Sequence, residues 1–145
     1  MASNESVREP RLTGHRVEKA VYLAKNNRGA EVRIGSSDQE GVFSPGELLQ
    51  LAAAACASLT ADHVLSNRLG PDFDASFAVD GVGEQNRYTS IDTQFTVDMS
   101  ELDPARHEAL IERALGAIER LCTVARTLNS GATTAVNLTP DDGRA

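Results

Sequence analysis

The sequence predicts an α+β fold in which antiparallel strands pack against long helices. Alternating apolar residues near the N-terminus and in the middle of the chain are typical of half-buried strands. One long apolar stretch follows residue 44, and a second stretch after residue 103 has apolar residues at helical spacing. Because no repeat or linker divides the 145 residues, we expect one domain over residues 15–140, with a flexible arm at 1–14 and a tail at 141–145.

The N-terminal part of the domain predicts a hairpin. A first strand, imperfectly alternating, runs over residues 16–23, and a second, with charged residues between apolar ones, runs over 30–34. Residues 26–29 read Asn-Asn-Arg-Gly, and they predict the turn because Asn and Gly tolerate positive φ. Residues 42–43 predict a short third strand before the first helix.

The first helix has a clear start signal. Ser44 at the N-cap, Pro45 at the first helical position and Glu47 three residues after Ser44 form a predicted capping box. Residues 48–59 are apolar on nearly all sides, which is typical of a buried helix. Gly70, followed by proline, ends it. A helix of this kind must be covered by a sheet, by another subunit or by both.

The middle of the chain predicts a second hairpin. Apolar residues alternate over 73–79 and again over 91–99, and the segment between them is rich in turn-forming residues. We assign the glycines of Gly-Val-Gly at 81–83 to that turn, since the motif is too short for a phosphate-binding loop.

The C-terminal part predicts an amphipathic helix and a last strand. Asp103-Pro104 repeats the cap signal, and an apolar stripe at helical spacing follows as far as Leu121. Cys122 therefore lies at the C-terminal end of this helix. Residues 132–138 predict the final strand.

Composition limits the class of function. Acidic residues outnumber basic ones by 21 to 14, and no basic patch offsets the net charge of −7, so we expect no nucleic-acid partner and no anionic membrane partner. The polar N-terminus predicts no secretory signal, and no run of about 18 uncharged apolar residues predicts a membrane span. We expect a cytoplasmic protein, in which a permanent structural disulfide would be unusual.

Cys56 and Cys122 are the two cysteines of the chain. Each taken alone fits a small apolar packing residue. A reactive thiolate needs a cation, a helix N-terminus or a hydrogen-bond donor, and Cys56 lies about three turns into its helix, beyond the reach of that helix's own N-terminus. Its partner must come from elsewhere, and Arg28, Arg33 and Arg126 are the candidate counter-ions.

Other titratable residues are less suited to act on Cys56. His63 follows it by seven residues, about 10 Å along the helix axis, which is too far for direct proton transfer. Glu47 precedes it by nine residues and faces the opposite side, so it is first a capping residue. Because the cysteines and the three histidines lack paired ligand spacing, we expect neither a metal nor an organic cofactor.

Two motifs together resemble a known family. Ser-Pro-Gly-Glu-Leu-Leu at residues 44–49 opens an apolar helix, and a cysteine follows the Glu by nine positions. Downstream, Cys-x-Val-x-Arg-x-Leu at residues 122–128 lies at a helix end. This combination resembles the OsmC/Ohr family of osmotically inducible and organic-hydroperoxide-resistance proteins. The resemblance covers roughly residues 16–139.

The resemblance implies an intertwined homodimer with the long helices of both subunits buried at its centre. It also implies a thiol peroxidase that reduces organic hydroperoxides, or hydrogen peroxide, with an external dithiol or lipoyl-type reductant. By motif position, Cys56 would be oxidised to the sulfenic acid and Cys122 would resolve it as a Cys56–Cys122 disulfide. Arg28 best matches the arginine that activates the thiolate in such enzymes. Glu47 is the nearest counterpart of the glutamate that pairs with this arginine.

Two positions depart from the family pattern. The family glutamate of the Ohr branch follows the proline directly, where this chain has Gly46, and the second cysteine is commonly followed by proline, where this chain has Thr123. The chain thus resembles a divergent OsmC-like member. Two other hypotheses follow: a ligand-binding or redox-sensing protein in which the pKa of Cys56 is not depressed, or a dimeric structural protein with packing cysteines.

Overall fold

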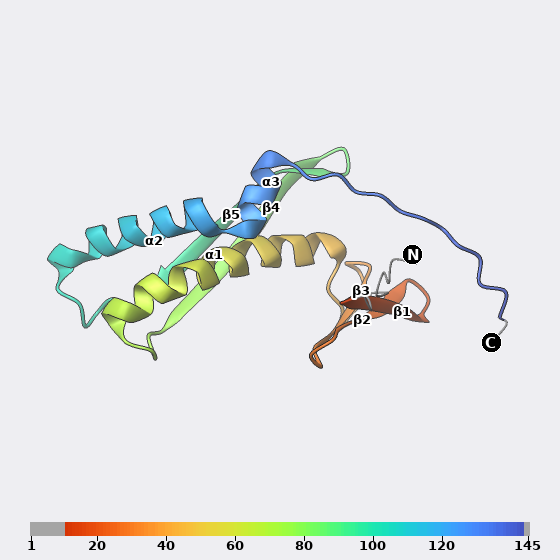
Figure 1. Cartoon of the computed structure of the whole chain (residues 1–145), viewed down its shortest axis with the longest axis horizontal. Coiled ribbons are helices and arrows are strands. Elements are labelled where there is room, and N and C mark those ends of the chain that lie inside the picture. The colour runs from red at the N-terminus through yellow and green to blue at the C-terminus, as the bar shows by residue number, and fades with distance from the viewer. Residues whose placement is uncertain (1–10, 144–145) are drawn as a thin grey trace, which may run out of the picture. The chain divides into compact units, whose positions relative to one another are not determined.

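The computed structural model describes residues 11–143 and confirms the predicted α+β class with antiparallel sheets and a long helix (Figure 1). The chain divides into two compact units, unit 1 up to Leu51 and unit 2 from Ala52. Because helix α1 (Pro45–Leu69) runs through this division, one domain over residues 15–140 stays a prediction. Most of the N-terminal arm and the end of the C-terminal tail lie outside the described residues.

Unit 1 contains a three-stranded antiparallel sheet in the order β1-β2-β3. Its strands are β1 (Leu12–Glu18), β2 (Val21–Asn26) and β3 (Glu31–Gly35). The prediction of one strand over residues 16–23 was therefore wrong, because the chain reverses at Lys19 and Ala20. Ala20 adopts a φ of 56°, a conformation that no Gly or Asn announces in the sequence. The first strand also begins at Leu12, within the predicted arm.

The predicted turn between β2 and β3 is confirmed. The side chain of Asn26 accepts hydrogen bonds from the N–H groups of Arg28 and Ala30, both at 2.9 Å, and Gly29 has a φ of 93°. The predicted third strand over residues 42–43 is only a single parallel bridge, between Phe43 and Ile34.

Helix α1 begins as the capping box predicts. The Ser44 N–H donates to the Glu47 carboxylate at 2.9 Å, and the Glu47 N–H donates to the Ser44 hydroxyl at 3.1 Å. Gly70, with a φ of 91°, follows its last residue. Ala54, Ala61 and Leu65 are buried, whereas Leu59 is 74% exposed. The chain by itself thus covers only part of this apolar helix.

By length and composition α1 can also span a membrane, which the sequence analysis did not expect. Core helices of water-soluble proteins meet the same criterion, and two residues in the second half of α1 belong to a buried cluster. Ala61 and Leu65 form a buried cluster with Leu110 and Ala114, and β-strand side chains such as Phe95 pack against it.

Unit 2 combines α1 from Ala52 onward with a long hairpin and two more helices (Figure 1). Its elements are β4 (Ala75–Glu84), β5 (Arg87–Val97), the 3-10 turn η1 (Pro104–Arg106), α2 (His107–Leu121) and α3 (Thr123–Ser130). The predicted cap at Asp103 closes η1, since the Asp103 carboxylate accepts from the N–H of Ala105 at 3.0 Å, whereas the N-cap of α2 itself is Arg106, which makes no side-chain capping bond. Helix α2 buries Leu110, Ala114 and Ala117, whereas Ile111, Leu115 and Leu121 of its apolar stripe are exposed.

The turn of the β4–β5 hairpin is shorter than predicted. It consists of Gln85 and Asn86 alone, with φ values of 51° and 62°. Such a two-residue turn matches the twist of the flanking strands, so they continue up to it. The glycines at 81–83 therefore belong to β4 and not to the turn. At Gly83 a Cβ atom would lie 2.5 Å from the carbonyl oxygen of Arg87, which explains a glycine there.

The predicted strand over residues 132–138 was wrong for this chain. After α3 the chain continues without regular structure, and Val136 and Leu138 are 93% and 98% exposed. A strand needs a neighbour to satisfy its N–H and C=O groups, and no described strand pairs with this segment.

Candidate functional site

The two cysteines meet within unit 2. Cys56 projects from α1 and is half-buried, whereas Cys122 is fully buried. Cys122 lies between two helices, as the C-cap of α2 and the N-cap of α3, in an extended conformation with φ −69° and ψ 101°. The two sulfur atoms are hydrogen-bonding neighbours. We call Cys56 and Cys122 the thiol pair.

The N-terminus of α3 points at Cys56. The pKa of the Cys56 thiol is lowered, mainly because the backbone N–H of Val124 donates to its sulfur. Smaller contributions of the same sign come from the Cys122 thiol, the N–H of Thr123 and the hydroxyl of Thr60, while burial acts in the opposite direction. A helix N-terminus is a known environment of reactive cysteines, because its unpaired N–H groups stabilise the thiolate.

Cys122 has the opposite electrostatics. The pKa of its thiol is raised, mainly by burial and then by the neighbouring Cys56, although N–H groups of Ala125 and Val124 partly offset this. As pH rises, Cys56 therefore loses its proton first while Cys122 stays protonated. The arrangement provides one thiolate and, beside it, one thiol that donates a hydrogen bond to it.

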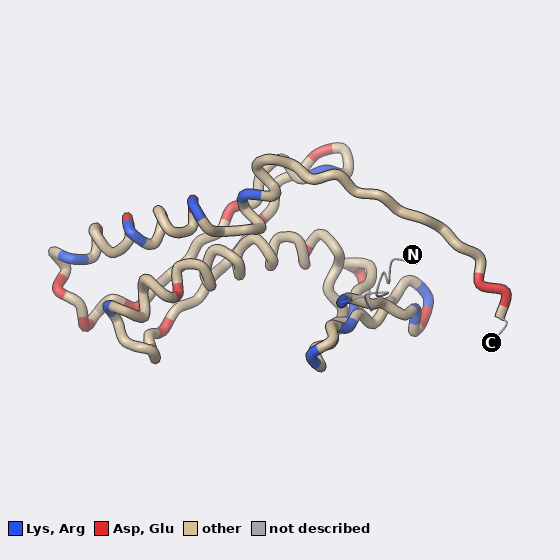
Figure 2. The backbone as a smooth tube through the Cα atoms, viewed as in Figure 1, with Lys and Arg blue, Asp and Glu red and all other residues tan. Residues whose placement is uncertain are grey.

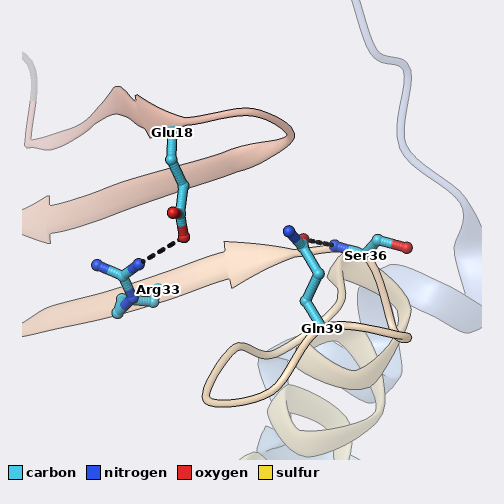
Figure 3. A network of polar contacts seen from close by, with 4 residues as sticks. All are labelled: Glu18, Arg33, Ser36 and Gln39. Carbon is cyan, nitrogen blue, oxygen red and sulfur yellow. Dashed lines mark hydrogen bonds and ion pairs between the residues drawn. The ribbon is translucent and has the colours of Figure 1, made fainter.

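The three arginines proposed as counter-ions are placed differently. In unit 1, Arg33 on β3 donates to the carboxylate of Glu18 on β1 at 3.1 Å. Figure 3 shows these two side chains facing each other, with Ser36 and Gln39 bonded to each other in the loop after β3. In unit 2, Arg126 donates to the carbonyl oxygen of Arg120 at 3.0 Å, at the end of α2.

Arg28 lies in the β2–β3 turn of unit 1. Its backbone N–H bonds to Asn26, and its guanidinium makes no hydrogen bond or ion pair with the residues that the structure describes. Of the three candidates it alone has a guanidinium without such a partner. Its role stays a prediction.

Glu47 and His63 have local partners. The pKa of Glu47 is lowered by the backbone N–H of Ser44 and, to a smaller extent, by the Ser44 hydroxyl, as expected for a capping carboxylate. His63 is exposed and lies 3.5 Å from the side-chain amide of Asn67, one turn along the same helix. Among residues 11–143, no group of three His, Cys, Asp or Glu side chains is placed to hold a metal ion.

The N-terminus of α3 is a functional element that was not predicted from the sequence. The partner of Cys56 was expected to come from outside α1, but as a cation and not as backbone N–H groups. The position of Cys122 could have indicated this helix start. Cys122 ends one predicted helix, and the residues after it, Thr-Val-Ala-Arg, can begin another helix with Cys122 as its N-cap.

Residues 37–137 match the family described as OsmC-like protein. This chain belongs to that family. Among its relatives is an uncharacterized protein of Mycobacterium tuberculosis, 44% identical over 119 residues, a match that covers 81% of this chain and 85% of the relative. An uncharacterized protein of Mycobacterium bovis matches with the same values.

Solved structures share the fold. An OsmC-like protein from Mycoplasma pneumoniae aligns with a TM-score of 0.64 and 16% identity, over 85% of this chain and 89% of that one. The organic hydroperoxide resistance protein OhrB of Bacillus subtilis aligns with a TM-score of 0.51 and 17% identity, over 80% and 87% of the two chains. Membership of the OsmC-like family suggests a role related to peroxides.

Proposed function

We propose that this protein is a thiol peroxidase that reduces organic hydroperoxides, or hydrogen peroxide, in the cytoplasm. The observation that carries the proposal is the thiol pair, in which the N-terminus of α3 lowers the pKa of Cys56 while the pKa of its neighbour Cys122 is raised. A peroxidatic cysteine must be a thiolate at neutral pH, and a resolving cysteine must lie beside it. The fold similarity to an organic hydroperoxide resistance protein is consistent with this chemistry.

The reaction uses the two thiols in turn. The Cys56 thiolate attacks the terminal oxygen of the hydroperoxide, the O–O bond breaks, and the alkoxide leaves as an alcohol after taking up a proton. Cys56 is then a sulfenic acid. The Cys122 sulfur attacks the Cys56 sulfur, the S–O bond breaks, water leaves and a disulfide forms. An external dithiol, such as a lipoyl-type group, reduces the disulfide and is itself oxidised.

The test measures consumption of tert-butyl hydroperoxide by the reduced protein, first without any reductant. Wild type should consume about one equivalent and lose both thiols, because a disulfide forms. Cys122→Ser should consume one equivalent and hold a sulfenic acid, and Cys56→Ser should consume none. With dithiothreitol, wild type should turn over repeatedly. If wild type consumes no more than Cys56→Ser, the proposal fails.

We assign Arg28 to the same site, from its own subunit or from the partner subunit. Its guanidinium has no partner among residues 11–143, so it is available to bind the thiolate or the peroxide. Arg28→Gln should slow peroxide consumption about tenfold, since a developing anion loses a charged donor. Arg33→Gln is the matched control, because Glu18 already holds Arg33. Glu47, in this proposal, stabilises the start of α1.

The proposal includes a homodimer. Leu59 of α1 is 74% exposed, and an open groove of about 790 Å³ beside β5 and α2 is lined mainly by apolar side chains such as Phe95, Ile111 and Leu115. Apolar surface of this extent is typical of a subunit interface. Sedimentation should give a mass twice that of the chain, and a monomer at micromolar concentration would remove this part of the proposal.

The observations do not favour the non-catalytic alternatives. A protein that only binds ligands or packs its cysteines has no need for a depressed pKa at Cys56, whereas the Val124 N–H lowers it. Rapid alkylation of Cys56 at pH 6 would count against both alternatives.

A further inference from the structure

A second concave site lies in unit 2, where α1 ends and α2 begins. A pocket of about 330 Å³ is lined there by Arg68, Leu102, Arg106, Ala109, Leu110 and Arg113. Three of these six residues are arginines, and no Asp or Glu lines the pocket. Figure 2 shows blue segments near this end of the two helices, with red ones on the segment that leads from β5 into α2. Since α2 spans about 21 Å by its rise per residue, this pocket lies well away from Cys122.

The three arginines have no anionic partner among the residues that the structure describes. Across residues 11–143 the ion pairs are Lys25–Glu31 and Arg33–Glu18, and neither involves this pocket. Asp103, three residues before Arg106, accepts a hydrogen bond from the backbone N–H of Ala105. A chain with a net charge of −7 has many carboxylates that could neutralise three arginines, so their convergence on one pocket without such a partner requires another explanation.

Arginine side chains that converge on a small pocket select a compact anion. Each guanidinium presents a planar fork of N–H donors, which fits two oxygens of a phosphate. The pocket lies at the N-terminus of α2, whose macrodipole also favours negative charge. Its volume is at the lower end of small-molecule sites, and Leu102 and Leu110 supply an apolar floor.

We propose that this pocket binds a small phosphate-bearing molecule through Arg68, Arg106 and Arg113. At neutral pH a phosphate group carries about −1.5 to −2 charges on several oxygens, and a pyrophosphate carries more, so either can engage more than one guanidinium fork. The site is independent of the thiol pair, and binding there does not require peroxidase activity.

The experiment is titration calorimetry of the full-length protein with inorganic pyrophosphate at 0.15 M salt, a concentration that screens unspecific attraction. Wild type should bind saturably, with one site per chain. Arg106→Gln and Arg113→Gln should each weaken the affinity about tenfold or more, because each removes a charged hydrogen-bond donor. Arg87→Gln, in the β4–β5 hairpin, makes the same charge change outside the pocket and should leave the affinity unchanged.

The outcomes separate this proposal from its rivals. Absence of saturable pyrophosphate binding to wild type overturns it, as does an equal loss of affinity in Arg87→Gln, which would indicate unspecific attraction. Saturable binding of citrate without binding of pyrophosphate overturns the phosphate assignment. Thermal unfolding of each variant shows whether it is folded, and a folded Arg113→Gln with wild-type affinity excludes Arg113 from the site. Peroxide consumption by the same variants should equal that of wild type.

Discussion

At the N-terminus of α1 the free N–H groups are hydrogen-bonded by side chains of the same helix end, whereas at the N-terminus of α3 they are directed at a side chain from another helix. Ser44 and Glu47 satisfy the first N–H groups of α1 reciprocally. At α3, the N-cap residue Cys122 makes no capping hydrogen bond with its side chain, and the N–H groups of Val124 and Thr123 interact with the sulfur of Cys56. The same unpaired donors therefore serve stability in one helix and the chemistry of a thiol in the other.

This difference teaches where a reactive group obtains its charge stabilisation. Both helix starts lower the pKa of an acidic group, Glu47 at α1 and Cys56 at α3. Glu47 is exposed and ionised at neutral pH in any case, so its lowered pKa matters only in acid. A thiol is ordinarily protonated at neutral pH, so the same effect on Cys56 changes its reactivity under physiological conditions.

The largest expected effect is the difference in reactivity between the two thiols. In the reduced wild-type protein at pH 7, Cys56 should react with iodoacetamide at least about ten times faster than Cys122, because a thiolate is the nucleophile. The pH midpoint of the Cys56 reaction should lie below the ordinary value for a thiol, and that of Cys122 above it. Peptide mass spectrometry of samples quenched at intervals measures both rates.

Buried thiols also react slowly for steric reasons, and Cys122 is fully buried. The midpoint is therefore the decisive quantity, since access changes the rate at every pH but leaves the midpoint unchanged. In denaturant the two midpoints should become equal. Equal midpoints in the folded protein would remove the role assigned to the N-terminus of α3.

The next effect concerns the start of α1. Ser44→Ala removes one half of the capping box and should lower the free energy of unfolding by about 1 kcal/mol. The lowered pKa of Glu47 means that its contribution to stability is present at neutral pH and is lost as the pH falls through that pKa. Because Ser44→Ala keeps the backbone N–H that lowers this pKa most and removes only the hydroxyl, urea unfolding should show a slightly weaker dependence on acidic pH in the variant. The alkylation midpoint of Cys56 should not change, and a shift there would mean that the two helix starts are coupled.

Much of the fold could be predicted because local signals were strong. The capping box, the Asn-Asn-Arg-Gly turn and the stripe of α2 depend on neighbouring residues alone. The wrong predictions concern segments whose structure depends on residues distant in sequence or on an unusual backbone conformation. The turn at Ala20 uses positive φ without Gly or Asn, and residues 132–138 have a strand pattern but no described strand beside them.

The candidate site could be predicted in its residues but not in its electrostatics. Cys56 and Cys122 are the chain's two cysteines, and motif resemblance paired them. The donor to Cys56 is a set of backbone N–H groups 67 and 68 residues further along the chain, at Thr123 and Val124. Backbone donors have no sequence signature of their own, so a search by residue type selects charged side chains such as Arg126, which instead bonds to a helix end.

The smallest expected effect tests one of those backbone donors. Thr123→Pro removes a single N–H from the start of α3, at the first helical position, where proline is well tolerated. The preceding residue, Cys122, already has the extended conformation that proline requires of its neighbour. We expect the pKa of Cys56 to rise and its alkylation at pH 7 to slow about two- to threefold, because the larger contribution, from Val124, remains.

Thr123→Ala is the control for this substitution, because it removes the same exposed side chain and keeps the N–H. Its alkylation midpoint should equal that of wild type, so the difference between the two variants isolates one hydrogen-bond donor. If Thr123→Pro and Thr123→Ala have the same midpoint, the N–H of Thr123 does not act on the thiolate. The proline that commonly follows this cysteine in the family would then be electrostatically equivalent to threonine, and Val124 would carry the helix contribution alone.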